Sequence, residues 1–350
     1  MAGAIIRRDG VAGRITLDRP GALNAITHDI CRATVAALDD WRHDDRIALV
    51  ILDAAGDRAF SAGGDIAFMH AAGTRGDFGA GRGFWHDEYR MNLMLADYPK
   101  PVVAFMQGFV MGGGVGYGCH AAHRVAGETT QVAMPECGIG LIPDVGGSYL
   151  LARAPGQLGV YLGLTGARMG AGDAIAAGFA DRFVPQGVWP ALIAELCRTG
   201  DPALIAAAAE PAPDRPLADA RAWIDAVFDA GRVGDMLVRL DADASAMAAQ
   251  ARKALRRASP LSLVCALPMI RAQQARTDLR AALRQEYRFT WRALEHSDFV
   301  EGIRAQIIDK DRSPRWRHDS VESVSATDVA RMLAPLGADE LTFVQEESEQ

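Results

Sequence analysis

The stretch from residue 134 to 147, MPECGIGLIPDVGG, restricts local folding more than any other segment of this chain. Pro135 and Pro143 each lack a backbone donor and fix φ, so neither a regular helix nor a central strand can run through it. The glycines permit tight turns and close approach of backbone or ligand. Glu136 and Asp144 are therefore expected on a rigid, apolar loop, where poor solvation raises the pKa of a carboxylic acid. Such groups suit general acid or base catalysis near neutral pH, and the plain alternative is a pair of solvated turn carboxylates.

Two further glycine-rich segments each follow an apolar run that predicts a buried strand. Residues 110–118 (VMGGGVGYG) follow residues 102–106, and residues 59–66 (AFSAGGDI) follow residues 48–52. Two such turns can aim one bare N–H each at a single oxygen, as in an oxyanion hole. A phosphate cradle is the competing chemistry, but neither a following Lys-Ser/Thr nor a GxGxxG pattern is present. Taken singly, each cluster also fits an ordinary turn.

Ordered motifs along the chain resemble the crotonase (enoyl-CoA hydratase/isomerase) superfamily. They are ITLDRPGALNA at 15–25, FSAGGD at 60–65, GFVMGGG at 108–114 and LTG at 164–166, together with the 134–147 stretch. The resemblance covers roughly residues 4–186. It implies an α/β fold built as a spiral of ββα units, although no sequence repeat is visible.

Departures from the hydratase pattern indicate which branch the chain resembles. Hydratases carry two glutamates, and the position of the first, just after the triple glycine, is Gly116 here. Water addition to a double bond needs both an acid and a base, so this loss argues against a hydratase. Asp144 stands where hydratases typically have glycine. With residues 286–288 (EYR) and 298–316, the pattern is similar to the 3-hydroxyisobutyryl-CoA hydrolase branch over about residues 4–317.

This resemblance implies hydrolysis of a short branched 3-hydroxyacyl-CoA thioester. The expected reaction is 3-hydroxyisobutyryl-CoA to 3-hydroxyisobutyrate and CoA, in valine catabolism. The N–H groups of Gly64 and Gly113 would form the oxyanion hole that stabilises the tetrahedral intermediate. Glu136 would either attack the carbonyl or activate water, and Asp144 would orient Glu136 or pass a proton to the leaving thiolate.

The same resemblance implies the remaining binding residues. Gly113, Glu136 and Asp144 would also contact the acyl part of the substrate, and backbone around Ala22, Ala62, Asp65 and Ile66 would bind CoA. No cofactor is expected beyond the CoA carried by the substrate. No cluster of His, Cys, Asp and Glu has the spacing of a metal site, so no metal is expected.

Glu88 is a third carboxylate of interest, on an amphipathic helix ahead of the strand that leads to the triple glycine. On sequence alone, such a residue belongs to a solvated face. The resemblance implies instead that Glu88 accepts a hydrogen bond from the 3-hydroxyl of the substrate, which would reject acyl groups that lack it. His86, on another face of that helix, is assigned to packing or to the surface.

Composition favours a cytoplasmic enzyme with a small-molecule substrate. The net charge of −7 disfavours nucleic acid and anionic membranes as partners. No secretory signal peptide and no membrane-spanning apolar run are expected. The five scattered cysteines contain no CxxC and indicate reduced thiols, with Cys137 packed rather than nucleophilic. The resemblance also implies a homo-oligomer, which is trimer-based in many members.

The alternation of strand and helix patterns predicts two parts. Residues 1–210 are expected to form the α/β core with the acyl-CoA site, and residues 211–350 a helical region with an acidic tail. A proline-rich connector at 210–216 separates them. Helices are predicted at residues 27–41, around 84–96, and at 242–257, 279–294 and 325–333.

Two other classes of function stay open. One is an enoyl-CoA hydratase or isomerase that uses Glu136 and Asp144 across a bound enolate, served by the same oxyanion hole. The other is an inactive CoA-binding or scaffold protein. The presence of Glu136, Asp144 and all three glycine-rich turns argues against that second alternative.

Overall fold

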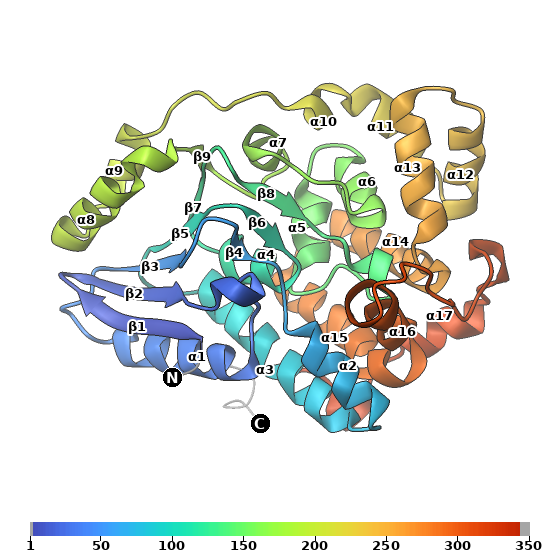
Figure 1. The fold of residues 1–350 in the computed structure, drawn as a ribbon, viewed down its shortest axis with the longest axis horizontal. Helices are drawn as coiled ribbons and strands as arrows, with labels where there is room; N and C mark the ends of the chain where they lie inside the picture. The colour runs from blue at the N-terminus through green and yellow to red at the C-terminus, as the bar shows by residue number, and fades with distance from the viewer. Residues whose placement is uncertain (1–2, 344–350) are drawn as a thin grey trace. The chain divides into compact units, whose positions relative to one another are not determined.

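The computed structural model describes residues 3–343, and its strands all lie before residue 184 (Figure 1). They form a six-stranded sheet in the order β1-β2-β3-β5-β7-β9 and a three-stranded sheet in the order β4-β6-β8. The bounds are β1 Ala4–Asp9, β2 Ala12–Leu17, β3 Leu49–Ala54, β4 Ala59–Ser61, β5 Val102–Met106, β6 Phe109–Met111, β7 His123–Ala126, β8 Gln131–Ala133 and β9 Arg182–Phe183.

Strand pairing follows a repeating scheme. β1 and β2 are antiparallel, and every other ladder between named strands of the described chain is parallel. β3, β5 and β7 enter the larger sheet in turn, while the strand after each of them, β4, β6 or β8, enters the smaller one. One or more helices follow each pair before the next step. This is the crotonase-like spiral of ββα units, which confirms the predicted α/β fold.

Helices between and after the strands complete this part of the chain. Thr27 caps the first of them, because its hydroxyl accepts a hydrogen bond from the Ile30 N–H at 3.2 Å. The bounds are α1 His28–Arg42, α2 Ile66–Thr74, α3 Phe78–Ala96, α4 Gly113–Gly118, α5 Gly147–Arg153, α6 Leu158–Thr165, α7 Ala171–Ala176, α8 Trp189–Thr199, α9 Ala203–Ala207 and α10 Pro216–Asp219.

Beyond residue 220, the described chain contains helices and no strand, as predicted. Ser245 and Ser325 cap two of these helices, and Asp328 completes a capping box with Ser325. The bounds are α11 Arg221–Phe228, α12 Val233–Asp241, α13 Ala246–Arg257, α14 Pro260–Ala275, α15 Leu279–His296, α16 Phe299–Ile303 and α17 Ala326–Leu333. Most of the predicted acidic tail, residues 344–350, lies outside the described residues.

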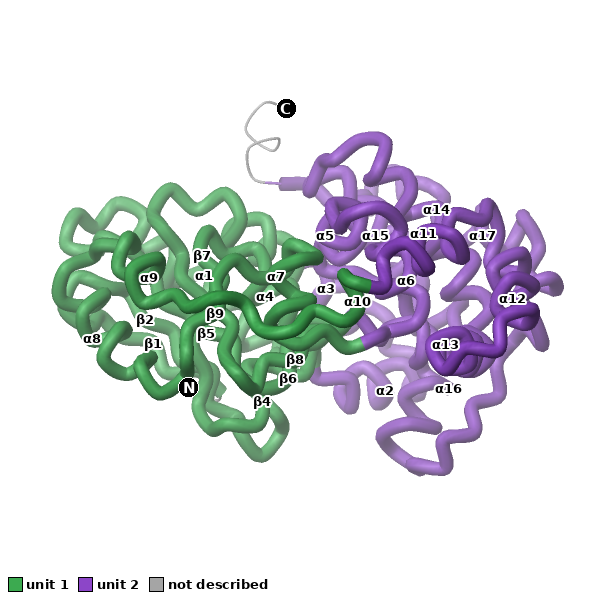
Figure 2. The backbone as a smooth tube through the Cα atoms, turned by 90° about the horizontal axis from the view of Figure 1, so that it is seen from above, with its two compact units in different colours: residues 1–64, 87–133, 168–219 green, residues 65–86, 134–167, 220–350 purple. Residues whose placement is uncertain are grey.

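The chain forms two compact units that alternate along the sequence (Figure 2). Unit 1 comprises residues 1–64, 87–133 and 168–219, and it carries every strand of the described chain. Unit 2 comprises residues 65–86, 134–167 and 220–350, and its regular elements are helices. The predicted boundary between residues 210 and 211 rests on sequence patterns and stays a prediction.

The core of unit 1 lies between its larger sheet and helices α8 and α9. Ile51, Val103 and Phe105 on the central strands pack against Trp189 and Leu196 of α8. The rings of Phe105 and Trp189 meet edge to face with centroids 5.3 Å apart. Each fully buried aliphatic or aromatic side chain contributes about 1.5–3 kcal/mol, so this packing fixes the strands whose ends carry the glycine turns.

Candidate active site

The first glycine turn follows β4 and is attached to the segment before α1. Ala62 N donates to Leu23 O at 3.0 Å, and Ile26 N donates to Gly63 O at 2.8 Å. Gly63 has φ +115°, a value that side chains disfavour, and a Cβ there would lie 3.2 Å from Met111 O. These contacts fix the orientation of the following amide, that of Gly64.

The second glycine turn places Gly113 beside Gly64. Gly112 caps α4 with φ +50°, and Gly113 is the first helical residue. A Cβ added to Gly113 would lie only 3.0 Å from the Gly64 nitrogen. Within the described residues, neither of these amides donates a backbone hydrogen bond. Two adjacent amides with open donors are what an oxyanion hole requires.

Glu88 lies next to this glycine pair. It is 2% exposed, so the sequence-only interpretation of a solvated face is wrong. Its Oε1 atom is 2.7 Å from the position that a Cβ on Gly113 would occupy, so any side chain at 113 would collide with the carboxylate. The structure therefore brings Gly64, Glu88 and Gly113 together within unit 1.

The residues implied in CoA binding lie around the first glycine turn in sequence. Ala22 ends a short 3-10 turn, and Ala62 is held beside it through the bond to Leu23. Asp65 caps α2, since its Oδ1 accepts from Phe68 N at 3.3 Å, and Ile66 is the first residue of that helix. Ala22 and Ala62 belong to unit 1, whereas Asp65 and Ile66 belong to unit 2.

Glu136 begins a short 3-10 turn in unit 2, and the predicted absence of a regular helix or strand there is confirmed. Its side chain is 4% exposed, and within the described residues Glu136 Oε2 has no hydrogen-bond partner. Burial, followed by the charges of Asp144 and Glu286, raises the pKa of Glu136 well above its ordinary value. This is the poorly solvated acid that the 134–147 stretch predicts.

Asp144 precedes a tight and strained turn. Gly147 N donates to Asp144 O at 2.7 Å, and between them Val145 has φ +55° and Gly146 φ +78°. A β-branched residue in the left-handed region costs on the order of 1–3 kcal/mol, so the surrounding structure must hold it there. Asp144 is 4% exposed and lies close enough to Glu136 to raise the pKa of that residue.

Glu286 is a buried carboxylate of unit 2 to which no motif assigned a role. It lies on α15, fully buried, and accepts hydrogen bonds from Gly146 N at 2.7 Å, from Ser148 N at 2.9 Å and from the Ser148 hydroxyl. Burial raises the pKa of Glu286 to about 7. A pattern in the sequence could have found it, because Glu286 occupies the apolar face of α15 with Ala282, Phe289 and Ala293.

The segment 298–316, which distinguishes the hydrolase branch, packs against the Glu136 turn. A Cβ on Gly140 would lie 2.4 Å from the Asp298 carbonyl carbon, and a Cβ on Gly302 would lie 2.1 Å from Ile139 O. Ser259 joins the two segments, since its N–H donates to Cys137 O at 2.9 Å and its hydroxyl to Asp298 at 2.6 Å. The segment thus supports the backbone that carries Glu136.

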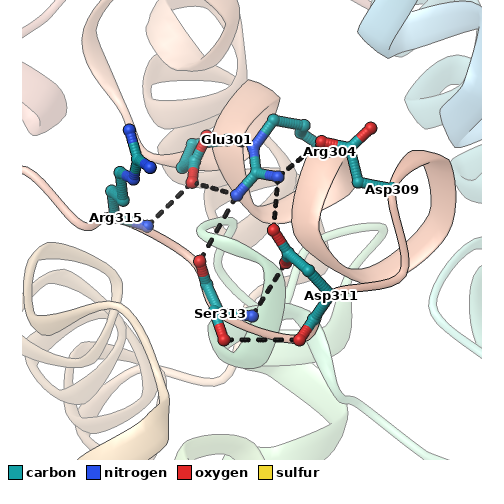
Figure 3. Close-up of polar contacts among 6 residues, drawn as sticks. All are labelled: Glu301, Arg304, Asp309, Asp311, Ser313 and Arg315. Atoms are coloured by element: carbon teal, nitrogen blue, oxygen red, sulfur yellow. Dashed lines mark hydrogen bonds and ion pairs between the residues drawn. The ribbon is translucent and has the colours of Figure 1, made fainter.

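Arg304 organises the rest of that segment (Figure 3). Its guanidinium donates to both carboxylate oxygens of Glu301 at 2.8 Å, to Asp309 at 2.6 Å and to Asp311 at 2.7 Å. Glu301 also accepts from Arg315 N at 2.8 Å. Arg304 begins a turn of π-helix, a form found often near functional sites.

The cysteines and possible metal ligands are the remaining candidate groups. Cys137 is buried, and burial, followed by the charge of Glu136, raises the pKa of its thiol well above the ordinary value, which agrees with a packed side chain. All five cysteines are free. Among residues 3–343, no group of three or more His, Cys, Asp and Glu side chains could hold a metal ion.

Comparisons with known proteins agree with the motifs. A model of the enoyl-CoA hydratase/isomerase family matches residues 12–333. The mitochondrial 3-hydroxyisobutyryl-CoA hydrolase of Danio rerio is 37% identical over 95% of this chain and 89% of that protein, and the Homo sapiens one is 35% identical over 97% and 90%.

Two solved structures share the fold over nearly the whole chain. One, described as an enoyl-CoA hydratase from Rhodobacter sphaeroides, is 54% identical with a TM-score of 0.93 over 98% of this chain and 100% of that one. The other, described as a carnitinyl-CoA dehydratase from Mycobacterium thermoresistibile, is 40% identical with a TM-score of 0.94 over 98% and 99%.

Proposed function

This chain belongs to the enoyl-CoA hydratase/isomerase family, and we propose that it is an acyl-CoA thioester hydrolase whose substrate is 3-hydroxyisobutyryl-CoA. The products are 3-hydroxyisobutyrate and CoA, a reaction that belongs to valine catabolism. The observation that carries the proposal is the buried carboxylate pair Glu136 and Asp144, with glycine at position 116. Similarity to 3-hydroxyisobutyryl-CoA hydrolases over nearly the full chain supports it.

In the proposed reaction, the N–H groups of Gly64 and Gly113 stabilise the oxygen of the thioester carbonyl as it becomes negative. Removal of one such donor typically costs about 2.7–4 kcal/mol of transition-state stabilisation. Ionised Glu136 either attacks the carbonyl carbon, giving an anhydride that water then cleaves, or removes a proton from the attacking water. Either route breaks the C–S bond, adds one water and releases CoA as a thiol.

The other proposed roles concern binding. Asp144 orients Glu136 or passes a proton to the leaving thiolate, and Glu88 accepts a hydrogen bond from the 3-hydroxyl of the acyl group. Ala22, Ala62, Asp65 and Ile66 bind CoA. The reaction needs no cofactor beyond the CoA of the substrate and no metal, so activity should survive exhaustive treatment with a chelator.

A second candidate is an enoyl-CoA hydratase or isomerase, favoured by the description of the 54%-identical structure. Hydration of a double bond needs a proton donor and a base, and Gly116 leaves the family's first glutamate position without a side chain. Asp144 would have to replace it. The oxyanion hole serves both reactions and does not separate them.

One assay separates these functions. Thiol release is measured with 3-hydroxyisobutyryl-, 3-hydroxypropionyl-, isobutyryl- and crotonyl-CoA, alongside loss of the crotonyl double bond. We expect thiol release, fastest with 3-hydroxyisobutyryl-CoA. Loss of the double bond without thiol release would establish the hydratase instead, and CoA binding without any turnover would indicate a scaffold protein.

Glu136→Gln tests the central residue. It keeps the shape but removes the charge needed for attack or proton abstraction, so we expect kcat to fall by about 10²-fold or more. CoA binding, measured by calorimetry, should persist, and Glu210→Gln on the exposed connector is the matched control. Near wild-type turnover in Glu136→Gln would contradict the mechanism.

Location and assembly are further proposals. We propose a cytoplasmic enzyme, supported by free cysteines, although the vertebrate relatives are named as mitochondrial and cysteines stay reduced in any reducing compartment. No helix within residues 3–343 has the length and apolar character to cross a membrane. We also propose a trimer-based homo-oligomer. Cell fractionation and light scattering test the two proposals.

A further inference from the structure

We propose that Glu286 is a positioning residue for this reaction: its ionised carboxylate holds the turn that carries Asp144 and keeps one proton on the Glu136–Asp144 pair. This inference rests on the proposed hydrolase function. It assigns a role to a residue on α15, in the C-terminal helical region, far in sequence from the 134–147 stretch that carries the chemistry.

Three donors converge on the Glu286 carboxylate. Oε2 accepts from Gly146 N at 2.7 Å, while Oε1 accepts from Ser148 N at 2.9 Å and from the Ser148 hydroxyl. The side chain is 0% exposed, so water cannot replace these bonds. Burial raises the pKa of this carboxyl group to about 7, by more than the three donors lower it, so Glu286 is ionised above that pH.

The clamped segment is the strained one. Val145 is buried with φ +55°, and the Gly146 and Ser148 amides on its C-terminal side are those that bind Glu286. Strained backbone of this kind persists only where the surroundings over-determine it. Without the Glu286 carboxylate, the turn can relax and carry the preceding residue, Asp144, away from its present position.

The charge of Glu286 acts on both catalytic carboxylates. It raises the pKa of Glu136, and it is itself coupled to Asp144. Three buried acids cannot all be ionised at low cost, so their protons are shared as one coupled system. Above about pH 7, where Glu286 is anionic, its charge favours retention of a proton by the Glu136–Asp144 pair. The pair then holds a base or nucleophile and a proton donor for the leaving thiolate.

Other charged groups lie on α15 itself and on the elements that pack against it, which include α2, α5, α14, α16 and α17. Three arginines of unit 2 are hydrogen-bonded elsewhere: Arg82 donates to Trp291 O and Glu295, Arg153 to the Tyr149 hydroxyl, and Arg271 to Ala230 O. Arg331 is the basic residue of α17. The acids on α16 and α17 are engaged as well, Glu301 with Arg304 and Asp328 with Ser325. His70 on α2 is the remaining titratable group of that helix. Among the acids, and after the effect of burial, the charges of Asp144 and Glu286 raise the pKa of Glu136, and the charge of Asp144 raises the pKa of Glu286.

The test is the pH dependence of kcat in Glu286→Gln. We expect kcat to fall on the order of 10- to 100-fold with KM little changed, as for misplacement of a catalytic group. Removal of a negative neighbour makes the pair easier to ionise, so the acid limb of the profile should move to lower pH. Glu286→Asp keeps the charge and should leave the limb in place with a reduced kcat.

Two controls separate positioning from general damage. Ser148→Ala removes one donor without removing charge, and it should leave the acid limb where it is in wild type. Glu210→Gln controls for loss of a distant charge. If Glu286→Gln lowers kcat equally at every pH, the residue is merely structural and the inference is overturned.

Failure of the inference and failure of the function give different results. Absence of thiol release by wild type refutes the proposed function. If wild type hydrolyses the thioester but the acid limb of the pH profile does not move in Glu286→Gln, only the proposed role of Glu286 is refuted. If Glu286→Gln does not fold, Glu286→Asp decides, because a limb that moves although the charge is retained overturns the inference.

Discussion

At the residue scale, the chemistry proposed for unit 2 depends on carboxylates that burial has separated from water. Glu136 and Asp144 are each 4% exposed, and both lie on a loop in which Pro135 and Pro143 fix φ. A buried acid has a raised pKa and a neighbouring acid raises it further. An ionised base and a protonated acid can therefore coexist near neutral pH, as water attack on a thioester requires.

Asp144→Asn should lower kcat for thioester cleavage by about 10- to 100-fold, since the amide can neither hold nor deliver a proton. The acid limb of the pH profile should also move to lower pH, because the charge that raises the pKa of Glu136 is gone. Thiol release as a function of pH is the measurement. Unchanged hydrolysis would assign Asp144 a structural role.

A double variant that replaces the hydrolase carboxylate arrangement with that of hydratases also tests Asp144. Asp144→Gly with Gly116→Glu restores the carboxylate arrangement of hydratases, and we expect this double variant to lose thioester hydrolysis. A gain of crotonyl-CoA hydration requires the new glutamate to be positioned to within a fraction of an ångström. A double variant that still hydrolyses the thioester would contradict the role of Asp144.

Glu88 is expected to set substrate preference. Its buried carboxylate beside Gly113 can accept a hydrogen bond from a 3-hydroxyl, and an unhydroxylated acyl group cannot donate that bond. Wild type should strongly prefer 3-hydroxyisobutyryl-CoA over isobutyryl-CoA, and Glu88→Ala should bring the two kcat/KM values together. Glu88→Ala should lower kcat/KM mainly for the hydroxylated substrate, by an amount that corresponds to about 1.5–3 kcal/mol of transition-state stabilisation. Glu88→Gln keeps an acceptor and should retain part of the preference, whereas an unchanged ratio in Glu88→Ala would exclude this role.

The sequence predicts some of these residues better than others, for physical reasons. Glu136 and Asp144 are predictable because the constraint on them is local, in the prolines and apolar residues of the same loop. Glu88 is not, since burial of a helical glutamate depends on packing distant in sequence, here against Gly113. Glu286 belongs to the EYR motif of the resemblance and lies on an apolar helix face, but its bonding role was not predictable because its donors lie 138 and 140 positions away.

At the element scale, helix caps and close packing decide where the helices begin. α3 starts at Phe78, earlier than the helix expected around 84–96, even though Gly79, Gly81 and Gly83 disfavour a helix. Asp77 Oδ1 accepts from Ala80 N at 3.2 Å, and a Cβ on Gly81 would lie 2.5 Å from Leu294 Cδ1. Packing against α15 thus outweighs the low helix propensity of these glycines, and no local sequence pattern indicates that packing. α17 begins one residue after its predicted start, behind its cap Ser325, whereas α13 begins at Ala246, behind its cap Ser245, four residues after the predicted start at 242.

Arg304→Ala should loosen the segment from residue 304 to 315 without unfolding unit 2. The guanidinium is the common partner of Glu301, Asp309 and Asp311, and its removal leaves three like charges near one another (Figure 3). Limited proteolysis should then cut this segment faster than in wild type. Arg315→Ala keeps the Arg304 cluster, because Arg315 binds Glu301 through its backbone, and it should be cut at the wild-type rate.

At the scale of the whole molecule, one repeated step builds the sheets, and a buried charge affects the stability of the finished fold. β3 pairs with β5 and β5 with β7, while β4, β6 and β8 form the second layer of steps. Each parallel pairing joins strands that are far apart in the sequence, and no sequence repeat indicates which strands will pair. The spiral was therefore predictable only through the resemblance. The helices beyond residue 220 were predicted from helical periodicity, although the last strand of the described chain already ends at Phe183 and α8 and α9 precede residue 211.

Glu286 should make the stability of the protein depend on pH in a defined window. Its pKa is raised from 4.5 to about 7, so the folded state binds this proton more tightly than the unfolded state does. The resulting stability is fully present below pH 4.5, is lost as the pH rises to about 7, and is constant above that. At about 1.4 kcal/mol per pKa unit, the change is on the order of 3 kcal/mol.

Urea unfolding of wild type and Glu286→Gln across this window isolates the effect. Glutamine does not titrate, so the stability of wild type relative to the variant should fall between pH 4.5 and 7 and then level off. The lost hydrogen bonds add an offset that does not vary with pH, and Glu210→Gln should show neither effect. A difference that is flat over the window, or that grows with pH, would mean that Glu286 is already ionised at pH 4.5 in the folded protein.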